Sequence, residues 1–440
     1  MLTGKYFLLG WSIVVLSAVG VLPSWADTIF LVNPKANQEQ ATPQETFAEV
    51  QLKKGLASLI QGDLKAAEAA LRESLKLKPD QVSALVGLAD VNVRKGQKNE
   101  AAEYLQKALT LAPQNPAVQR SWGRYLASQK RFGEAEAAFK KAISLNPGSA
   151  ALAQVELGDL YLAGMNNPAK AIPAYRAAIS LDPRVPGAHY SLGMALGSSG
   201  ETAKAEGEFQ EAGRQEPGNP MPLQALAVLY LQRRELDKAL QSFSEALKVQ
   251  PEFIPAHMGR GEVFEATGKD ASALAEYSAV LKVGPKFAPA YVKIGVIHQR
   301  HNRAAEAKQA YLSAIGIDPS QVIAYNNLAF EAAERRVNLD EAVTWAKKAV
   351  SLQPQIAQFQ DTLGWVYRAR GELDQAALAL NKAVSLNPSD PDVFYHLGLV
   401  YAEAGKNREA ATALKKALDL KPDFPASADA RRRLVQLGKQ

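Results

Sequence analysis

The 440-residue sequence contains no cysteine. This absence excludes disulfide bonds, thiolate zinc sites, thiol catalysis and a lipid anchor on an N-terminal cysteine. Histidine is scarce, with five in the chain, and only His298 and His301 stand close together, on one face of a helix and without a nearby third ligand. We therefore expect no metal site and no cofactor.

The sequence also lacks a strong excess of positive or negative charge. The formal net charge is +6, and lysines and arginines alternate with acidic residues along most segments. Such mixing is typical of solvated helix faces and does not indicate nucleic-acid binding.

Catalytic motifs are missing as well. The chain has no Walker lysine motif, no G-x-S-x-G elbow and no H-E-x-x-H pair, and "GRGEVF" (259–264) resembles a phosphate loop only superficially because no strand precedes it. Without convergent polar groups, an enzyme is not expected.

One long apolar run is present, at residues 6–22, between Lys5 and "PSWA" (23–26). A positive start, an apolar stretch and small residues before a cleavage point predict a secretory signal peptide at 1–26, cut after Ala26. The alternative is an uncleaved inner-membrane anchor, because the run approaches spanning length. Both interpretations place the remainder outside the cytoplasm, periplasmic or extracellular. We expect residues 27–47 to form a polar leader or linker.

A proline recurs through the rest of the chain with a nearly constant spacing. The steps are 34 residues, except for one of 36 and one of 35; the prolines are Pro79, Pro113, Pro147, Pro183, Pro217, Pro251, Pro285, Pro319, Pro354, Pro388 and Pro422. An alanine stands twelve residues before each proline, a glycine or alanine about 24 before it, and usually a large side chain eight before it. In the ninth unit that last position is Ala346. A fixed period of this length indicates a solenoid of stacked helix pairs, each ended by its proline.

The pattern resembles the tetratricopeptide repeat. The segment "LGLVYAEAGKNREAATALKKALDLKP" (397–422) is close to a consensus unit. The resemblance implies an all-α, right-handed superhelical solenoid of about eleven helix-turn-helix units at 48–424. Residues 425–440 are expected to form a C-terminal capping helix. The two longer steps fall at 163–170 and 333–341, where we expect a longer turn between the paired helices. If either segment contacts a partner, Arg335 and Arg336 in the second segment are the better candidates.

The resemblance also implies that the first helix of each unit lines a concave surface where peptides or helices bind. The helical positions left over by packing predict which side chains face that surface. They are Tyr190, Met194, Met221, Val228, Leu231, Met258, Val292, Val296, Asn326, Phe330, Trp365, Tyr395 and Leu399. Methionines, aromatics and branched aliphatics suit an amphipathic helix or apolar peptide. The alternative is that some of them belong to the core. Arg120 and Arg124 could hold an isolated anionic group.

From sequence, we expect a non-catalytic scaffold of the cell envelope that binds a protein partner. Polysaccharide export, pilus or secretion machinery, and outer-membrane assembly are the candidate settings. The alternative is a carbohydrate-contacting accessory subunit that uses Trp365 and Tyr395.

Overall fold

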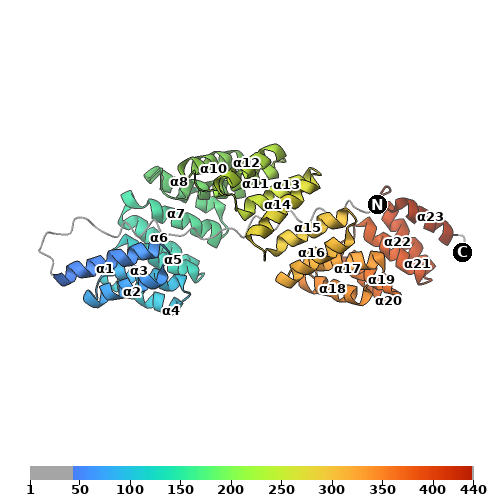
Figure 1. Ribbon diagram of the computed structural model, residues 1–440, viewed down its shortest axis with the longest axis horizontal. Coiled ribbons are helices and arrows are strands. Elements are labelled where there is room, and N and C mark those ends of the chain that lie inside the picture. The colour runs from blue at the N-terminus through green and yellow to red at the C-terminus, as the bar shows by residue number, and fades with distance from the viewer. Residues whose placement is uncertain (1–42, 439–440) are drawn as a thin grey trace. The chain divides into compact units, whose positions relative to one another are not determined.

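The computed structural model describes residues 43–438, which fall into two compact units on either side of Pro251 and Glu252. The predicted signal peptide and residues 27–42 of the predicted leader lie outside the described residues. Both units consist of helices packed as consecutive pairs, numbered here from one to eleven (Figure 1). The described residues contain no strand, so the predicted all-α solenoid of about eleven helix pairs is confirmed.

The N-terminal unit holds pairs one to six. Its helices are α1 (Pro43–Ile60), α2 (Leu64–Leu77), α3 (Val82–Arg94), α4 (Lys98–Leu111), α5 (Pro116–Ser128), α6 (Phe132–Leu145), α7 (Ala151–Asp159), α8 (Pro168–Leu181), α9 (Ala188–Ser198), α10 (Thr202–Gln215), α11 (Met221–Gln232) and α12 (Leu236–Val249).

The C-terminal unit holds pairs seven to eleven and one further helix. Its helices are α13 (Ile254–Ala266), α14 (Asp270–Val283), α15 (Ala288–Arg300), α16 (Ala304–Ile317), α17 (Val322–Arg335), α18 (Leu339–Leu352), α19 (Ala357–Arg370), α20 (Leu373–Leu386), α21 (Pro391–Glu403), α22 (Asn407–Leu420) and α23 (Ser427–Leu437).

The recurring prolines end the second helices as predicted. Every second helix stops two residues before its proline, as α6 does at Leu145 before Pro147. Proline cannot donate the next helical hydrogen bond, and it pushes the preceding residue out of helical geometry. The sequence therefore fixes the length of each pair.

The recurring small residues lie in the core. All eleven alanines that precede the prolines by twelve residues are at most 1% exposed. Each first-helix glycine of the pattern faces the large residue of its own second helix: an ideal Cβ on Gly295 would stand 2.5 Å from Cε1 of Tyr311. Tyr311 also shares a buried cluster with Leu328 of the next pair, so one ring packs both within and between pairs.

The two longer steps are absorbed mainly inside first helices, not in longer turns. In pair four, one extra residue joins the 3₁₀ turn Pro147–Ser149, and another lengthens the first helix through a π-helical turn, Leu160–Gly164. In pair nine, α17 runs one residue longer than most other first helices of the C-terminal unit. The turn inside each of these pairs keeps three residues, as in most other pairs, so the expectation of longer turns at 163–170 and 333–341 is wrong.

The last helix closes the C-terminal unit. Phe424 and Ala430 are buried with Leu414 and Ala417 of α22, which covers the end of the final pair. The predicted capping helix is confirmed. No described helix has both the length and the apolar character needed to cross a membrane.

Candidate functional site

The first helices lie side by side within each unit. In the N-terminal unit α7 contacts α9, and α9 contacts α11; in the C-terminal unit α17 contacts α19, and α19 contacts α21. Several hydrogen bonds cross between neighbouring first helices at about one repeat of sequence separation, for example Arg120 to Glu156 and His396 to Asp361. The first helices therefore present adjacent rows of side chains, and a candidate binding face is built from these rows.

Arg120 and Arg124, the predicted anion contacts, share a carboxylate of the neighbouring first helix. Arg120 donates two hydrogen bonds to Glu156, at 2.9 and 3.0 Å, and Arg124 donates one at 3.2 Å. Burial acts to raise the pKa of the Glu156 carboxyl, but the charges and hydrogen bonds of the two arginines outweigh it, so this pKa lies below its ordinary value. One of the two positive charges is thus neutralised, and the two guanidinium groups do not form an isolated anion site.

Asp159, at the end of α7, is a second acid on this face, and no basic side chain in the described part of the chain forms an ion pair with it. It accepts a hydrogen bond of 2.7 Å from the hydroxyl of Tyr175 and one of 3.5 Å from Ser191. Burial, together with the nearby charge of Glu156, raises the pKa of Asp159 to about 6. The sequence analysis did not identify this residue, because nothing in its local sequence marks it as buried.

The apolar residues predicted for this face in the N-terminal unit are partly exposed. They are Tyr190 and Met194 on α9, and Met221, Val228 and Leu231 on α11. The ring of Tyr190 lies 5.8 Å from that of Phe209 and is tilted against it. Two adjacent first helices therefore carry accessible apolar side chains at the predicted positions.

Half of the eight corresponding residues of the C-terminal unit are buried. Met258, Val292, Asn326 and Leu399 are 8%, 9%, 2% and 3% exposed. Met258 and Val292 each belong to a hydrophobic cluster that includes the tyrosine of a second helix. These four side chains are core residues and do not face outward as the helical phase predicts. Val296 and Phe330 remain partly exposed.

Trp365 and Tyr395, the aromatics proposed for carbohydrate contact, are engaged by other residues. The indole of Trp365 donates a 2.6 Å hydrogen bond to Glu334, and its ring centroid lies 4.4 Å from the guanidinium of Arg368 and 4.3 Å from the ring of His396. Tyr395 donates its hydroxyl to Asp429 of α23 and packs against Phe424. Neither ring offers a free platform.

His396 also forms a buried pair with Asp361 of the preceding first helix, at 2.7 Å. Burial acts to lower the pKa of His396, but the charge and hydrogen bond of Asp361 outweigh it and raise that pKa. The pair therefore ties α19 to α21.

His298 and His301 do not form a site. His301 contacts Asp270 at 2.8 Å, whereas Nδ1 of His298 is buried without a hydrogen-bond partner. Burial lowers the pKa of His298. No three histidine or carboxylate side chains among residues 43–438 are grouped as metal ligands would be.

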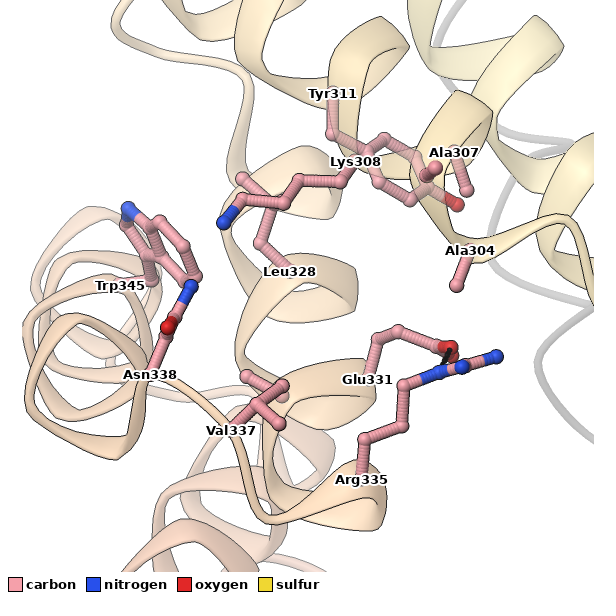
Figure 2. Close-up of a pocket in the computed structure, with 12 residues that line it drawn as sticks. Ala304, Ala307, Lys308, Tyr311, Leu328, Glu331, Arg335, Val337, Asn338 and Trp345 are labelled. Carbon is pink, nitrogen blue, oxygen red and sulfur yellow. Dashed lines mark hydrogen bonds and ion pairs between the residues drawn. The ribbon is translucent and has the colours of Figure 1, made fainter.

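A cavity of about 310 Å³ opens between α16, α17 and α18. It is lined by Ala304, Ala305, Ala307, Lys308, Tyr311, Leu328, Glu331, Ala332, Arg335, Val337, Asn338 and Trp345. Figure 2 shows Lys308 extending toward the side where Trp345 lies, and Val337 between Trp345 and the Glu331–Arg335 pair. The cavity adjoins the 333–341 segment that the 35-residue step marks, but no sequence pattern points to Lys308 or Trp345.

Comparisons with known proteins were made at the level of family, sequence and structure. The tetratricopeptide repeat family matches residues 52–116, 120–166, 160–220, 225–291 and 292–356, and related repeat profiles match 364–405 and 391–424. No curated protein sequence matches the chain.

Solved structures include several that are similar to this chain. They are the APC/C hetero-tetramer Cut9–Hcn1 (16% identity, TM-score 0.47, 90% of this chain and 97% of the other), Pseudomonas aeruginosa pilF (21%, 0.43, 51% and 100%) and yeast Tom70 (14%, 0.42, 90% and 96%).

Family profiles thus cover most of the described residues, and they coincide with the helix pairs that the proline spacing predicted. The chain belongs to the tetratricopeptide repeat family.

Proposed function

We propose that this protein is a non-catalytic adaptor that binds a partner's apolar segment along the first helices of its N-terminal unit. Membership of the tetratricopeptide repeat family supports the general part of the proposal, a scaffold for protein–protein interaction. The partner segment, an amphipathic helix or an apolar peptide, is the specific part.

The observation that carries the proposal is the accessible apolar row on α9 and α11. Met194 and Val228 are partly exposed on adjacent helices. Methionine adapts to irregular partner surfaces, and apolar side chains that stay accessible in a folded protein are suited to recognising an amphipathic helix.

The surrounding charges favour the same occupant. Arg120 and Arg124 both pair with Glu156, so these charged groups already have partners within the protein. A strongly charged partner would gain little here, whereas an apolar one would bury surface without leaving ions unpaired.

We further propose that the adaptor acts in the cell envelope, after export directed by residues 1–26. Support for this comes from the apolar run and the small residues that follow it. Sequencing the N-terminus of the protein purified from its source cells, fraction by fraction, tests the point. A chain beginning at Asp27 outside the cytoplasm is expected, and an intact Met1 in the cytosol contradicts it.

The carbohydrate alternative has weaker support. Trp365 is already in contact with Arg368 and His396, and Tyr395 with the capping helix. Stacking of a sugar would first require these contacts to be broken.

Site-specific photo-crosslinking tests the binding face. A photoreactive phenylalanine analogue is placed at Val228 and, as a matched control, at the exposed Leu181 of α8. We expect one dominant crosslinked segment from position 228, weakened when Met194→Ser is added, and none from position 181. Equal crosslinking at both positions, or none at 228, contradicts the proposal.

A further inference from the structure

The cavity in the C-terminal unit combines an apolar wall with one cation that has no acidic partner among the residues that the structure describes. Leu328, Ala332 and Val337 contribute apolar surface, and Trp345 adds an indole ring. Glu331 and Arg335, which also line it, pair with each other. The remaining charged group is Lys308.

Lys308 stands over the ring of Trp345, with its ammonium 5.8 Å from the ring centroid. Within residues 43–438 no carboxylate forms an ion pair with it. An ammonium held beside an aromatic ring and lacking an anion is a ready partner for an incoming carboxylate.

The loop beside the cavity is held in a costly backbone conformation. Arg336 and Asn338 both have a φ of 52°, whereas each of the other ten turns inside the pairs has a single residue with positive φ. Neither residue is glycine, so in each the Cβ makes this left-handed backbone conformation sterically unfavourable. Strain of this kind often marks a functional segment.

The strained loop holds Val337 outward. This side chain is 49% exposed although it lines the cavity. A branched aliphatic residue displayed between two left-handed residues is accessible surface that a partner could bury.

The volume limits what the cavity can hold. At about 310 Å³ it lies near the lower end of the range of about 300–1,000 Å³ typical for small-molecule sites. One large side chain of a partner fits this space better than a whole cofactor would.

We propose that this cavity is a second docking site, distinct from the first-helix face, and that it receives a large apolar side chain from a partner segment carrying a carboxylate next to that residue. The apolar side chain lies against Leu328, Val337 and Trp345. The carboxylate pairs with Lys308. The site does not depend on the first-helix interaction proposed above.

Two dipeptides that differ in one charge test the proposal on the full chain. The probes are acetyl-Asp-Phe-amide and acetyl-Asn-Phe-amide, titrated into protein labelled with ¹⁵N at tryptophan, with the Trp345 indole signal assigned through Trp345→Phe. We expect a saturable shift of that signal, with the Asp peptide binding about two- to fivefold more tightly, as a rim ion pair allows. Acetyl-Asp-Ala-amide, which lacks the large side chain, should produce no saturable shift.

Variants separate the two parts of the site. Lys308→Met should abolish the preference for the Asp peptide, whereas Lys282→Met, at an exposed lysine of α14, should leave it unchanged. Ala304→Leu should fill the cavity and remove the saturable shift, whereas Ala266→Leu on the exposed end of α13 should not. Thermal unfolding verifies that each variant is folded.

Three results would overturn the proposal: no saturable shift of the Trp345 signal, equal affinity for the two peptides, or a preference that survives Lys308→Met. A shift confined to the Trp122 or Trp365 signal would also overturn it, because the peptide would then bind elsewhere. The crosslinking experiment at Val228 reads out a different surface, so failure of one proposal is distinguishable from failure of the other.

Discussion

Pairs four and nine both exceed the 34-residue period, and they absorb the excess in different ways. Pair four inserts a 3₁₀ turn at Pro147–Ser149 and a π-helical turn at Leu160–Gly164. Pair nine has a longer α17 and a turn in which Arg336 and Asn338 both take positive φ. One pair changes its helical geometry, and the other stores strain in a loop.

The cores of the two pairs differ as well. In pair four, Gly158 lies against Tyr175: an ideal Cβ on the glycine would stand 2.5 Å from Cε1 of the ring. In pair nine the corresponding positions carry Ala329 and Ala346, both fully buried. Pair four therefore relies on one large ring in one glycine notch, whereas pair nine has no such ring.

Polar groups follow the same division. In pair four, Asp159 accepts a hydrogen bond from the hydroxyl of Tyr175, so this ring also positions an acid. Around pair nine, Lys308 and Trp345 line an open cavity. Of the two longer units, one is thus tightly packed around a tyrosine ring, and the other adjoins a recess.

The largest expected effect comes from adding a side chain at Gly158, where the Tyr175 ring of pair four packs. Gly158→Ala places a methyl group on the Tyr175 ring, and such overpacking costs about 1–3 kcal/mol of unfolding free energy. Urea unfolding followed by circular dichroism measures the loss.

The matched control is Gly207→Ala on α10, where nothing lies within 4 Å of the added Cβ. It should stabilise the chain slightly, because alanine is the better helix former. Ala329→Gly in pair nine should lose the helix propensity of alanine and the burial of one methyl group, without any overpacking. If Gly158→Ala lowers the unfolding free energy no more than Gly207→Ala does, close packing of Tyr175 on Gly158 does not distinguish the two pairs.

The next effect concerns Asp159 and depends on pH. Its folded-state pKa of about 6 lies above the ordinary 3.8. The folded unit therefore holds the proton more tightly than the unfolded chain does, and this group's contribution to stability falls as the pH rises from about 4 to 6. Asp159→Asn should stabilise the protein at pH 7.5 by about 1–2 kcal/mol, less than the full shift because the carboxyl keeps some contact with solvent.

At pH 4 the gain from Asp159→Asn should largely disappear, since the native carboxyl is then protonated. Asp80→Asn, at an exposed position, should show no comparable difference between the two pH values. Denaturant midpoints at pH 4 and 7.5 provide the measurement, and an equal gain at both would show that burial of the charge is not the cause.

The smallest effect concerns the strained turn of pair nine. Arg336→Gly should raise the unfolding free energy by about 0.5–1 kcal/mol, because glycine adopts positive φ without the steric penalty. Asn338→Gly should give a smaller gain, since asparagine tolerates this region better. Gln129→Gly, at the same position after the first helix α5, is the matched control: its φ of −87° needs no glycine, so the change should destabilise. A loss of stability in Arg336→Gly would mean that its φ of 52° is not strained.

The sequence predicted the repeated parts well. The spacing of Pro147 and its equivalents predicted where each second helix ends, and Ala135 and its equivalents proved to be buried. These features depend on local geometry that recurs eleven times, so each unit supports the interpretation of the others.

Side-chain exposure on the first helices was predicted less well. Tyr190 is partly exposed, whereas Met258 and Val292 occupy the equivalent position, three residues before the small residue of the first helix, and are buried. Helical phase gives the direction of a side chain, but its burial depends on the size of residues one repeat away. The effect of the 35-residue step was misjudged for a related reason, because an extra residue can enter a helix as readily as a turn.

The sequence by itself determined the number of helix pairs, the ends of their second helices and the alanine core, because these follow from period and backbone chemistry. The tertiary structure alone decided that Glu156 neutralises part of the Arg120–Arg124 charge, that Asp159 lies half-buried beside Tyr175, and that Lys308 stands over the ring of Trp345 at a cavity. Each of these contacts joins residues on different helices, and the distances between such residues are set by packing, which a single repeat unit does not encode.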